Sequence, residues 1–376
     1  MAGKPNKAGT KKSHSLAGKI LLAINFLAVI LLLLAYLAPF VSPEHFTIIA
    51  FFGIAYPVTL LINLIFIVVW MILGKWRMAF SIIAILLGYN HLRSLFQFHI
   101  AEDKEGKQPA IKILTYNVRV FDHFNRKNNI QIRNKIFDYL KTSGSDIYCF
   151  QEFYDNDNGS FPVLDTLTRL LQSESHVTEY FNTHEKHNHA GIVTMTKLHI
   201  INRENLRLNQ NSSYFGIFTD ILAGTDTIRV FNLHLESIKF SNEDYSFYND
   251  ISKQKDKDKL RKGSSKILSK LYDAFKKRAA QSDMAKQLIS RSPYPVIVCG
   301  DFNDTPTSYS YRQISGKLKD SFMERGLGLG KTYIGIFPSF RIDYILHDTT
   351  FICNKYNRGD VKYSDHYPVM AILNRK

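Results

Sequence analysis

Two long apolar runs near the N-terminus constrain this chain of 376 residues more than any other feature. Residues 20–40 carry almost only hydrocarbon side chains, with Asn25 as an exception, and residues 46–73 form a second run. At about 1.5 Å per residue of helix, each run exceeds the roughly 30 Å thickness of a bilayer's hydrocarbon core. Buried helices of a soluble domain rarely need apolar side chains on every face. We therefore expect membrane-spanning helices at about 19–40 and 46–73.

A third apolar run, residues 78–92, is shorter and carries Asn90 and His91 near its end. It can span a bilayer only if the bilayer thins or if the helix continues beyond Arg93. We expect a spanning helix at about 77–95, so that two or three helices form a membrane anchor over residues 19–100. A cleaved signal peptide does not fit, because the first run is too long and ends in "APFVSP" without a typical cleavage site.

Lysine and arginine residues near the helix ends predict the orientation of the anchor. "KPNKAGTKK", in a basic tail at 1–18, precedes the first run and "GKWR" follows the second, whereas the "VSPEH" loop between them has neither residue type. Basic flanks remain in the cytoplasm. Three spans would place everything after residue 100 outside the cytoplasm, and two would place it inside. We expect a multi-pass protein of the cell (inner) membrane with an extracytoplasmic C-terminal part.

The C-terminal part, residues 111–376, follows a polar linker at 101–110 and alternates strand-like with helical patterns. Short runs rich in β-branched residues, such as "IKILTYNV" and "YPVIVCGD", are separated by helical periodicity at 130–142 and at about 263–290. This mixture predicts a single α/β (α+β) domain with more than one layer. Three cysteines lie in strand-like runs, and their spacing fits packing better than a metal site: Cys149, Cys299 and Cys353.

The net charge of +15 suits a polyanion or an anionic membrane surface, and equally a solvated basic surface. Much of the excess comes from "SKQKDKDKLRKGSSK" at 252–266. This segment overlaps a stretch from Ile238 to Lys262 that looks like an insertion after the strand-like run "TIRVFNLHL". Such an insertion either shapes substrate choice or forms an unstructured loop. The composition leaves both alternatives open.

Six of the seven strand-like runs carry a polar or ionisable residue inside or just beyond the apolar part. Each residue alone has an ordinary explanation as a turn, surface or core residue. Strand ends at one edge of a sheet share a crevice, however, so the repetition predicts one pocket. An oxygen-rich set without cysteine suits Mg²⁺ or Mn²⁺. The residues are Asn117, Glu152, His234, Asp301 with Asn303, Asp343, and Asp365 with His366.

Six sequence blocks resemble the successive signatures of the endonuclease/exonuclease/phosphatase superfamily, which includes deoxyribonuclease I. They are "TYNV", "QEF", "NLHLES", "GDFNDTP", "RIDYIL" and "SDHYPV". The resemblance covers 111–376 and leaves the apolar helices outside. It implies a four-layer sandwich, with two packed β-sheets flanked by helices, and metal-dependent hydrolysis of a phosphate ester. The substrate would be a phospholipid headgroup or nucleic acid, cleaved by a phosphodiesterase.

The resemblance also implies a metal site. Glu152 would ligate Mg²⁺, with Mn²⁺ as the other suitable ion, and Asn117 would lie beside it. Asp365 would complete the metal's shell, directly or through water.

For catalysis, the resemblance implies that Asp301 orients and deprotonates the attacking water. Asn303 and His234 would hold phosphate oxygens. His366 would stabilise the phosphoryl group as negative charge develops, and Asp343 would fix the imidazole ring and favour its charged form.

Other residues near these blocks are interpreted as structural. Arg278 and Gln281 resemble a helical Arg-x-x-Gln of the family, and Asp304 is assigned to the turn after "GDFN". The first block, "TYNVRVFD", departs from the pattern of abasic-site endonucleases and argues against DNA repair.

Two other classes of function are less consistent with the sequence. A catalytically inactive, membrane-linked binding module would normally lack part of the polar set, and none of it is missing here. A transporter with an accessory domain fits less well, because the apolar runs carry few ionisable groups. The sequence does not indicate an oligomeric state.

Overall fold

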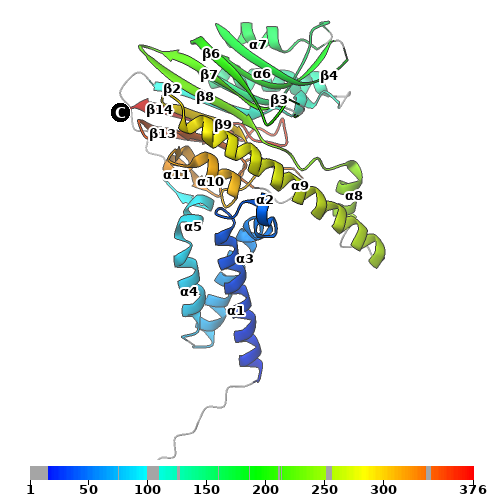
Figure 1. Cartoon of the computed structure of the whole chain (residues 1–376), viewed down its shortest axis with the longest axis vertical. Helices are drawn as coiled ribbons and strands as arrows, with labels where there is room; N and C mark the ends of the chain where they lie inside the picture. The colour runs from blue at the N-terminus through cyan, green and yellow to red at the C-terminus, as the bar shows by residue number, and fades with distance from the viewer. Residues whose placement is uncertain are drawn as a thin grey trace, which may run out of the picture.

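The computed structural model describes residues 16–74, 76–99, 110–124, 128–159, 161–185, 187–210, 212, 214–250, 256–335 and 340–376. Most of the predicted tail at 1–18 and of the predicted linker at 101–110 lies outside these residues. A helical region projects from a larger domain built on two β-sheets (Figure 1).

The helical region contains the predicted apolar helices. Helices α1 and α3 are long and apolar enough to cross a membrane, and α4 with α5 would count as a third span if the bent pair acts as one. A short helix, α2, connects α1 to α3. The bounds are α1 (Leu16–Leu37), α2 (Pro43–Phe46), α3 (Ile48–Ile72), α4 (Met78–Leu87) and α5 (Tyr89–Leu95).

Instead of one continuous helix at about 77–95, the structure has two helices that meet at Gly88 with a bend of 72°. The cause is the close approach of Tyr36 from α1. A Cβ atom at Gly88 would lie 2.0 Å from the Tyr36 ring, and the Tyr36 hydroxyl donates to the Ala84 carbonyl at 3.0 Å. That carbonyl is the helical acceptor for Gly88, whose N–H bonds to Ile85 instead, so the α-helical ladder ends there.

The first six-stranded sheet has the order β13-β14-β2-β3-β5-β4, and only its β2–β3 pair is parallel. The second has the order β10-β12-β9-β8-β7-β6, with β8–β9 as its parallel pair. The strands of the first sheet are β2 (Ala110–Asn117), β3 (Ile147–Asn156), β4 (Ser175–Glu185), β5 (Asn188–Thr196), β13 (Phe351–Arg358) and β14 (Val369–Arg375). Those of the second are β6 (His199–Arg207), β7 (Tyr214–Ala223), β8 (Asp226–His234), β9 (Val296–Asp301), β10 (Lys319–Asp320) and β12 (Asp343–His347).

The two sheets pack face to face around an apolar core that includes all three cysteines. Cys149 of β3 and Cys299 of β9 are fully buried there, as is Cys353. The three thiols are free and serve as small apolar side chains, in agreement with the packing role expected from the sequence.

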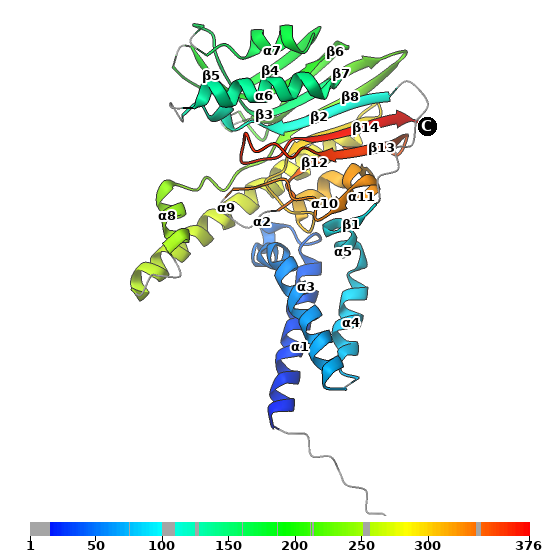
Figure 2. The same ribbon diagram turned by 180° about the vertical axis from the view of Figure 1, so that it is seen from behind.

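Helices cover the outer faces of both sheets (Figures 1 and 2). Helices α6 and α7 pack on the first sheet, and α9 and α10 pack on the second. The predicted four-layer sandwich is therefore confirmed. The remaining elements are η1 (Arg119–Asp122), α6 (Asn129–Ser143), α7 (Leu164–Leu170), α8 (Asn242–Asp250), α9 (Lys257–Ser290), α10 (Tyr309–Ser315), α11 (Ser321–Arg325) and the β1 (Gln97–Phe98)–β11 (Leu327–Gly328) pair.

The stretch at 238–262 is not a simple loop in its described part. It forms α8 and the first turns of α9, which begins at Lys257 rather than near residue 263. Asp256 caps α9 by accepting hydrogen bonds from the amides of Asp258 and Lys259. Lys270 of α9 bonds the Asp244 carboxylate of α8, so the two helices are held together.

Candidate active site

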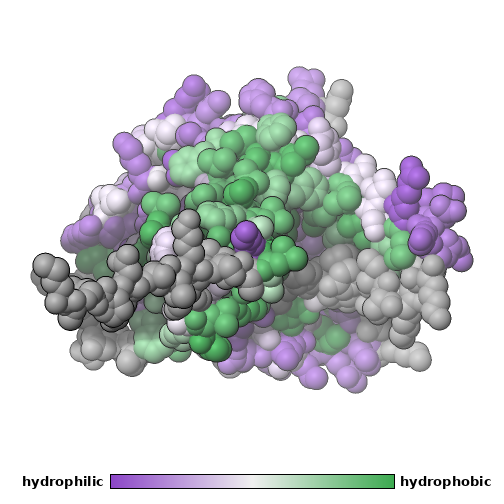
Figure 3. Space-filling view, turned by 90° about the horizontal axis from the view of Figure 1, so that it is seen from below, coloured by the Kyte–Doolittle hydropathy of each residue, from purple (hydrophilic) through white to green (hydrophobic). Residues whose placement is uncertain are grey.

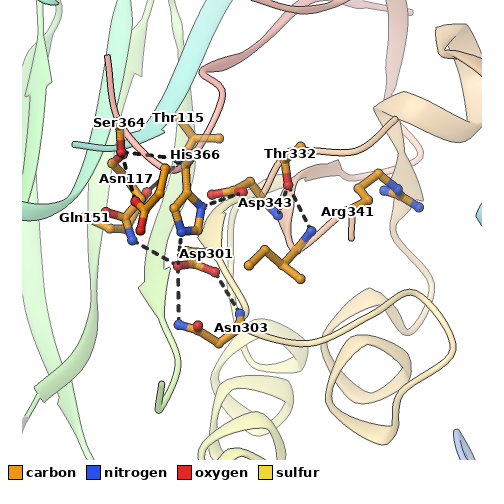
Figure 4. A network of polar contacts seen from close by, with 12 residues as sticks. Thr115, Asn117, Gln151, Asp301, Asn303, Thr332, Arg341, Asp343, Ser364 and His366 are labelled. Atoms are coloured by element: carbon orange, nitrogen blue, oxygen red, sulfur yellow. Dashed lines mark hydrogen bonds and ion pairs between the residues drawn. The ribbon is translucent and has the colours of Figure 1, made fainter. Parts of the chain in front are cut away.

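The ends of β8, β9 and β12 place three predicted residues side by side. His234 and Asp301 are partners in the parallel β8–β9 pair, and Asp343 is the partner of Asp301 across the antiparallel β9–β12 pair. In the facing sheet, Asn117 ends β2 beside Gln151 of β3, with Glu152 next along that strand. The polar side chains of both sheets therefore meet at one edge of the sandwich (Figure 4).

The end of β9 depends on Gly300. Its φ is +140°, and a Cβ atom there would lie 1.9 Å from the carbonyl oxygen of Leu233 in β8. Only glycine allows the two strands to approach this closely. Phe302 is fully buried. Asn303 does not continue the strand, but turns into the left-handed region with φ of 51°.

Asn303 nevertheless lies beside Asp301. Its backbone amide donates to Asp301 Oδ1 at 2.8 Å, and its Nδ2 lies 3.3 Å from Asp301 Oδ2. The same Nδ2 donates to the Leu235 carbonyl at 3.0 Å. Asn303 thus fixes the orientation of the Asp301 carboxylate.

Glu152 is positioned by an irregularity of β3. The pairing register with β5 shifts between Phe150 and Phe153, and Glu152 has φ of 48°. Such a β-bulge re-aims a side chain, and a left-handed non-glycine residue costs on the order of 1–3 kcal/mol. The bulge brings Glu152 Oε1 to 3.2 Å from Asn117 Nδ2.

Asp301 is the centre of the cluster and is almost fully buried. Its Oδ2 accepts from Asn117 Nδ2 at 3.0 Å and lies 3.7 Å from Nε2 of both His234 and His366. Burial raises the pKa of Asp301 to about 6, although the charge of His366 opposes this shift. A carboxylate with a pKa near neutrality is well suited to accept a proton.

His366 forms a buried pair with Asp343. Nδ1 of His366 lies 2.9 Å from Asp343 Oδ2, and the ring packs against Tyr333 with centroids 5.2 Å apart. Burial disfavours the charged ring, but the Asp343 and Asp301 carboxylates outweigh it and raise the pKa of His366 to about 10. His366 is therefore an imidazolium whose Nε2 faces Asp301.

Two buried polar atoms of the cluster have no hydrogen-bond partner among the described residues. They are Nε2 of His234 and Oδ1 of Asp343. His234 Nε2 lies 3.7 Å from both Glu152 Oε1 and Asp301 Oδ2, and burial lowers the pKa of this histidine. Unsatisfied buried groups are uncommon, and here they indicate capacity for a ligand.

The predicted metal ligands lie on the more open side of the cluster. The side chains of Glu152 and Asp365 are 37% and 27% exposed. Burial raises the pKa of Glu152; His366 opposes the shift and the Asp365 carboxylate adds to it. The Glu152 and Asp365 carboxylates repel each other and together form an all-oxygen donor set. Such a set fits a divalent cation such as Mg²⁺.

Asn117 lies beside Glu152 and links it to Asp301. Its Nδ2 donates to Glu152 and Asp301, while its Oδ1 accepts from the Arg119 amide at 3.0 Å. Asn117 thereby positions the two carboxylates.

A second group of donor atoms, from Asp301, Asp343 and His366, lies within 4.8 Å and could also hold a metal. This set differs from the predicted ligands. Because Asp343 Oδ2 is already bonded to His366 Nδ1, and because Mg²⁺ prefers oxygen, the trio fits proton transfer better than Mg²⁺ binding.

Several residues of the site were missed by sequence reasoning. Ser364, next to the "DH" of "SDHYPV", donates to the Asn117 carbonyl at 2.8 Å and accepts from the His366 amide. Thr332 accepts from the amides of Ile342 and Asp343. Its place as the first residue of "SDHYPV" could have identified Ser364, whereas nothing in the local sequence marks Thr332.

The inserted helix α8 also reaches the site. Tyr245 hydrogen-bonds Tyr333, which packs on His366. Burial raises the pKa of Tyr245, and the Asp365 carboxylate adds to the shift. Of the two alternatives for the insertion, the structure favours the one in which it shapes the site.

Arg278 and Gln281 support the loop after His234, as the structural interpretation expects. Gln281 accepts from the Glu236 amide at 2.8 Å, and Arg278 donates to the Glu236 carbonyl at 3.0 Å. Asp304 is more than a turn residue: it is buried and pairs with Arg278 Nε at 3.1 Å. The ion pair supplies the compensation that a buried carboxylate needs.

Comparison with known proteins identifies two segments. Residues 114–366 match the model of the Endonuclease/Exonuclease/phosphatase family, and residues 18–95 match a Domain of unknown function (DUF8431). No curated protein sequence matches the chain.

Solved structures share the fold at low identity. The human Nocturnin catalytic domain with bound sulfate is 16% identical, with 71% of this chain and 94% of that chain covered and a TM-score of 0.50. An endonuclease/exonuclease/phosphatase from Beutenbergia cavernae is 14% identical (71% and 72% covered, TM-score 0.49), and a mannosyl-6-phosphatase from Bacteroides thetaiotaomicron is 17% identical (70% and 99%, 0.46). Because the family match extends over more than half of the sequence, the chain belongs to the endonuclease/exonuclease/phosphatase family.

Proposed function

We propose that the protein is a membrane-anchored, metal-dependent phosphodiesterase whose active site is the Asp301 cluster. Members of its family hydrolyse phosphate esters and generally use a divalent metal. The observation that carries the proposal is the contact of the buried Asp301 carboxylate with the charged His366–Asp343 pair, beside the more open Glu152 and Asp365.

In this proposal Asp301 accepts the proton of the attacking water. Its raised pKa provides a base matched to neutral pH. Asn117 and Asn303 hold its two oxygens in place, so the carboxylate needs no reorientation during the reaction. The Nδ2 of Asn303 already contacts the Leu235 carbonyl and the Asp301 carboxylate, so we assign Asn303 to positioning Asp301. We assign the phosphate contact to His234.

His366 would stabilise the negative charge that develops on the phosphoryl oxygens. Asp343 keeps its ring charged and correctly oriented. Glu152 and Asp365 would hold Mg²⁺ or Mn²⁺. When bound, the ion neutralises phosphate charge and polarises the phosphoryl oxygen.

We further propose a division into a tail at 1–18, an anchor at 19–100, a linker at 101–110 and a catalytic domain at 111–376, with the catalytic domain outside the cytoplasm. Arg77 donates to the Gly18 carbonyl at 3.3 Å, so both basic flanks lie at the same end of the helices. The domain lies at the opposite end, where Phe40 packs against Arg312. Under the positive-inside rule, this geometry favours an extracytoplasmic domain. Protease treatment of intact cells tests this orientation.

The substrate would be a phosphodiester of a phospholipid headgroup or of nucleic acid. The test uses the full chain in detergent with bis(p-nitrophenyl) phosphate, phospholipid vesicles, and single- and double-stranded DNA. We expect hydrolysis with Mg²⁺ and none with EDTA. Asp301→Asn should lower the rate by about 10²-fold or more, because a positioned base is lost. Asp138→Asn, on the exposed side of α6, is the matched control.

An active Asp301→Asn variant, or metal-independent activity that copurifies with it, would refute the assignment. Binding of one substrate without any hydrolysis would favour the alternative, a catalytically inactive membrane-linked binding module.

A further inference from the structure

A cavity of about 490 Å³ lies between α3 and the catalytic domain, and none of its lining residues belongs to the active-site cluster. Its volume is typical of small-molecule sites, which range over about 300–1,000 Å³. The walls come from Ile54–Val58 of α3, Leu95 at the end of α5, and catalytic-domain residues Thr305–Thr307, Leu329, Lys331 and Phe340–Arg341.

Pro57 explains how α3 is attached beside this cavity. Proline has no N–H, so the carbonyl of Gly53, four residues earlier, has no helical donor. The Thr307 hydroxyl of the catalytic domain donates to this carbonyl at 2.9 Å. Gly53 permits the approach, since a Cβ atom there would lie 2.7 Å from Ala38 and 3.2 Å from the Thr307 carbonyl. The helix is therefore anchored at the edge of the cavity.

Two buried donors of the cavity lining lack partners among the described residues. Tyr56 is 1% exposed and its hydroxyl is unpaired. Arg341 donates to Asp320 at 2.7 Å and to the Ser94 carbonyl at 2.9 Å, but its Nε is unpaired. Apart from Tyr56, Arg341, Lys331 and two threonines, the lining is apolar, so the cavity suits a ligand that is largely hydrocarbon.

The position of the cavity indicates where such a ligand comes from. Val58, on the side of a helix apolar enough to cross a membrane, is 61% exposed, and Leu329 is 43% exposed. Seen from the helical end, apolar side chains gather in the centre and hydrophilic ones surround them (Figure 3). The cavity therefore reaches the surface where lipid would meet the domain, and the exposed Lys331 at its lining favours a phosphate.

We propose that this cavity binds one acyl chain of a membrane phospholipid whose phosphate lies beside the exposed Lys331. The proposal rests on the proposed membrane anchoring and not on catalysis. A lipid bound in this cavity would lie close to the active site, since Thr305 follows Asn303 by two residues. Lys331 directly precedes Thr332, which holds the Asp343 amide.

The test uses the full chain in nanodiscs of phosphatidylcholine and phosphatidylglycerol with a trace of phosphatidylcholine that carries a photoreactive diazirine in one acyl chain. After illumination, peptides are mapped by mass spectrometry. We expect label on Thr305–Thr307 of the catalytic domain as well as on α3. Ala55→Trp fills the cavity and should abolish the label at 305–307. Leu61→Trp, at a 58% exposed position of α3 outside the cavity, should leave it unchanged.

Lys331→Gln removes only the charge beside the cavity and provides a second variant in case Ala55→Trp does not fold, as judged by thermal unfolding. It should lower the amount of lipid retained by the chain in native mass spectrometry. Label that is confined to the exposed faces of the helices, or that Ala55→Trp and Lys331→Gln leave unchanged, would show that the cavity holds water only. Repeating the labelling with Asp301→Asn separates this result from any failure of the proposed hydrolysis.

Discussion

The molecule contains two buried polar networks that differ in whether their hydrogen bonds close. In the helical region, Asn25 donates to Ser81 at 2.8 Å and accepts from Trp70 at 2.9 Å. Ser81 donates to Asn63 at 2.9 Å, and Asn63 donates to two backbone carbonyls. In the active site, by contrast, His234 Nε2 and Asp343 Oδ1 remain unpaired among the described residues. We call the two sets the helical network and the active-site network.

The difference follows from what each network must do. Asn25, Asn63 and Ser81 come from α1, α3 and α4, where a bilayer would supply no water to satisfy them, so they must satisfy one another and thereby join the helices. The active-site network brings the carboxylates of Glu152, Asp301 and Asp343 together and leaves two atoms unpaired among the described residues, which suits the proposed cation and phosphate. A closed network indicates a structural role, and an open one indicates a ligand.

Replacing His366 by glutamine should give the largest effect. The change keeps a polar side chain but removes the charge that we propose stabilises the phosphoryl group. We expect kcat/KM for a phosphodiester to fall by about 10²–10³-fold, as for other lost stabilising donors. The buried Asp343 also loses its cationic partner, so some thermal stability should be lost as well. A large loss of stability with retained activity would contradict the comparison; Asp138→Asn serves again as the control.

Glu152→Gln should have the next largest effect and a different signature. It removes one charge from the proposed metal site while keeping the hydrogen bond to Asn117 feasible. We expect about 10–100-fold more Mg²⁺ to be needed for half-maximal activity, with the maximal rate partly restored at saturation. Titration of activity against Mg²⁺ measures this shift. An unchanged requirement would instead favour the Asp301, Asp343 and His366 set as the metal site.

The active-site network was largely foreseeable from the sequence because its members lie at strand ends within short blocks. Local spacing cannot reveal contacts between distant segments, however. The break at Gly88 depends on Tyr36, which lies 52 positions earlier in the sequence. Likewise, the left-handed turn at Asn303 and the bulge at Glu152 follow from pairing with neighbouring strands.

The helical network escaped prediction for the same reason. Asn25 and Asn63 are isolated polar residues in apolar runs, and their mutual link through Ser81 appears only when three helices pack together. The contact of Tyr245 in α8 with Tyr333 is another case, since the two residues lie in segments without any recognisable pattern.

Asn63→Leu tests whether the closed helical network stabilises the helical region. The change removes two donors and one acceptor from the helical network and leaves Ser81 without its acceptor. Hydrogen bonds between membrane helices contribute about 0.6–1.7 kcal/mol each, so we expect a loss of about 1–2 kcal/mol in the stability of the helical region. Thermal unfolding in detergent measures the loss, and hydrolysis per folded molecule should stay the same. Leu61→Ala, at an exposed position of the same helix, should have a smaller effect.

Glu324→Gln should give the smallest effect. It tests whether a closed polar network also stabilises the catalytic domain. Glu324 accepts from Lys319 Nζ at 2.8 Å and from the Cys353 amide at 3.2 Å, and it lies 3.2 Å from His347 Nε2, so this network is closed. Burial opposes the charge of Glu324, but these partners outweigh it and lower its pKa to about 2. A carboxyl whose pKa is lower in the folded state than its unfolded value of about 4.3 contributes stability above that value. This contribution is lost as the pH falls from about 4 towards 2.

Thermal unfolding between pH 7 and 2 should therefore depend less steeply on pH in Glu324→Gln than in the unsubstituted protein, with activity at pH 7 unchanged. Glu174→Gln, at an exposed position, should keep the original pH dependence. Equal slopes for all three proteins would show that a closed network in this domain need not stabilise the fold.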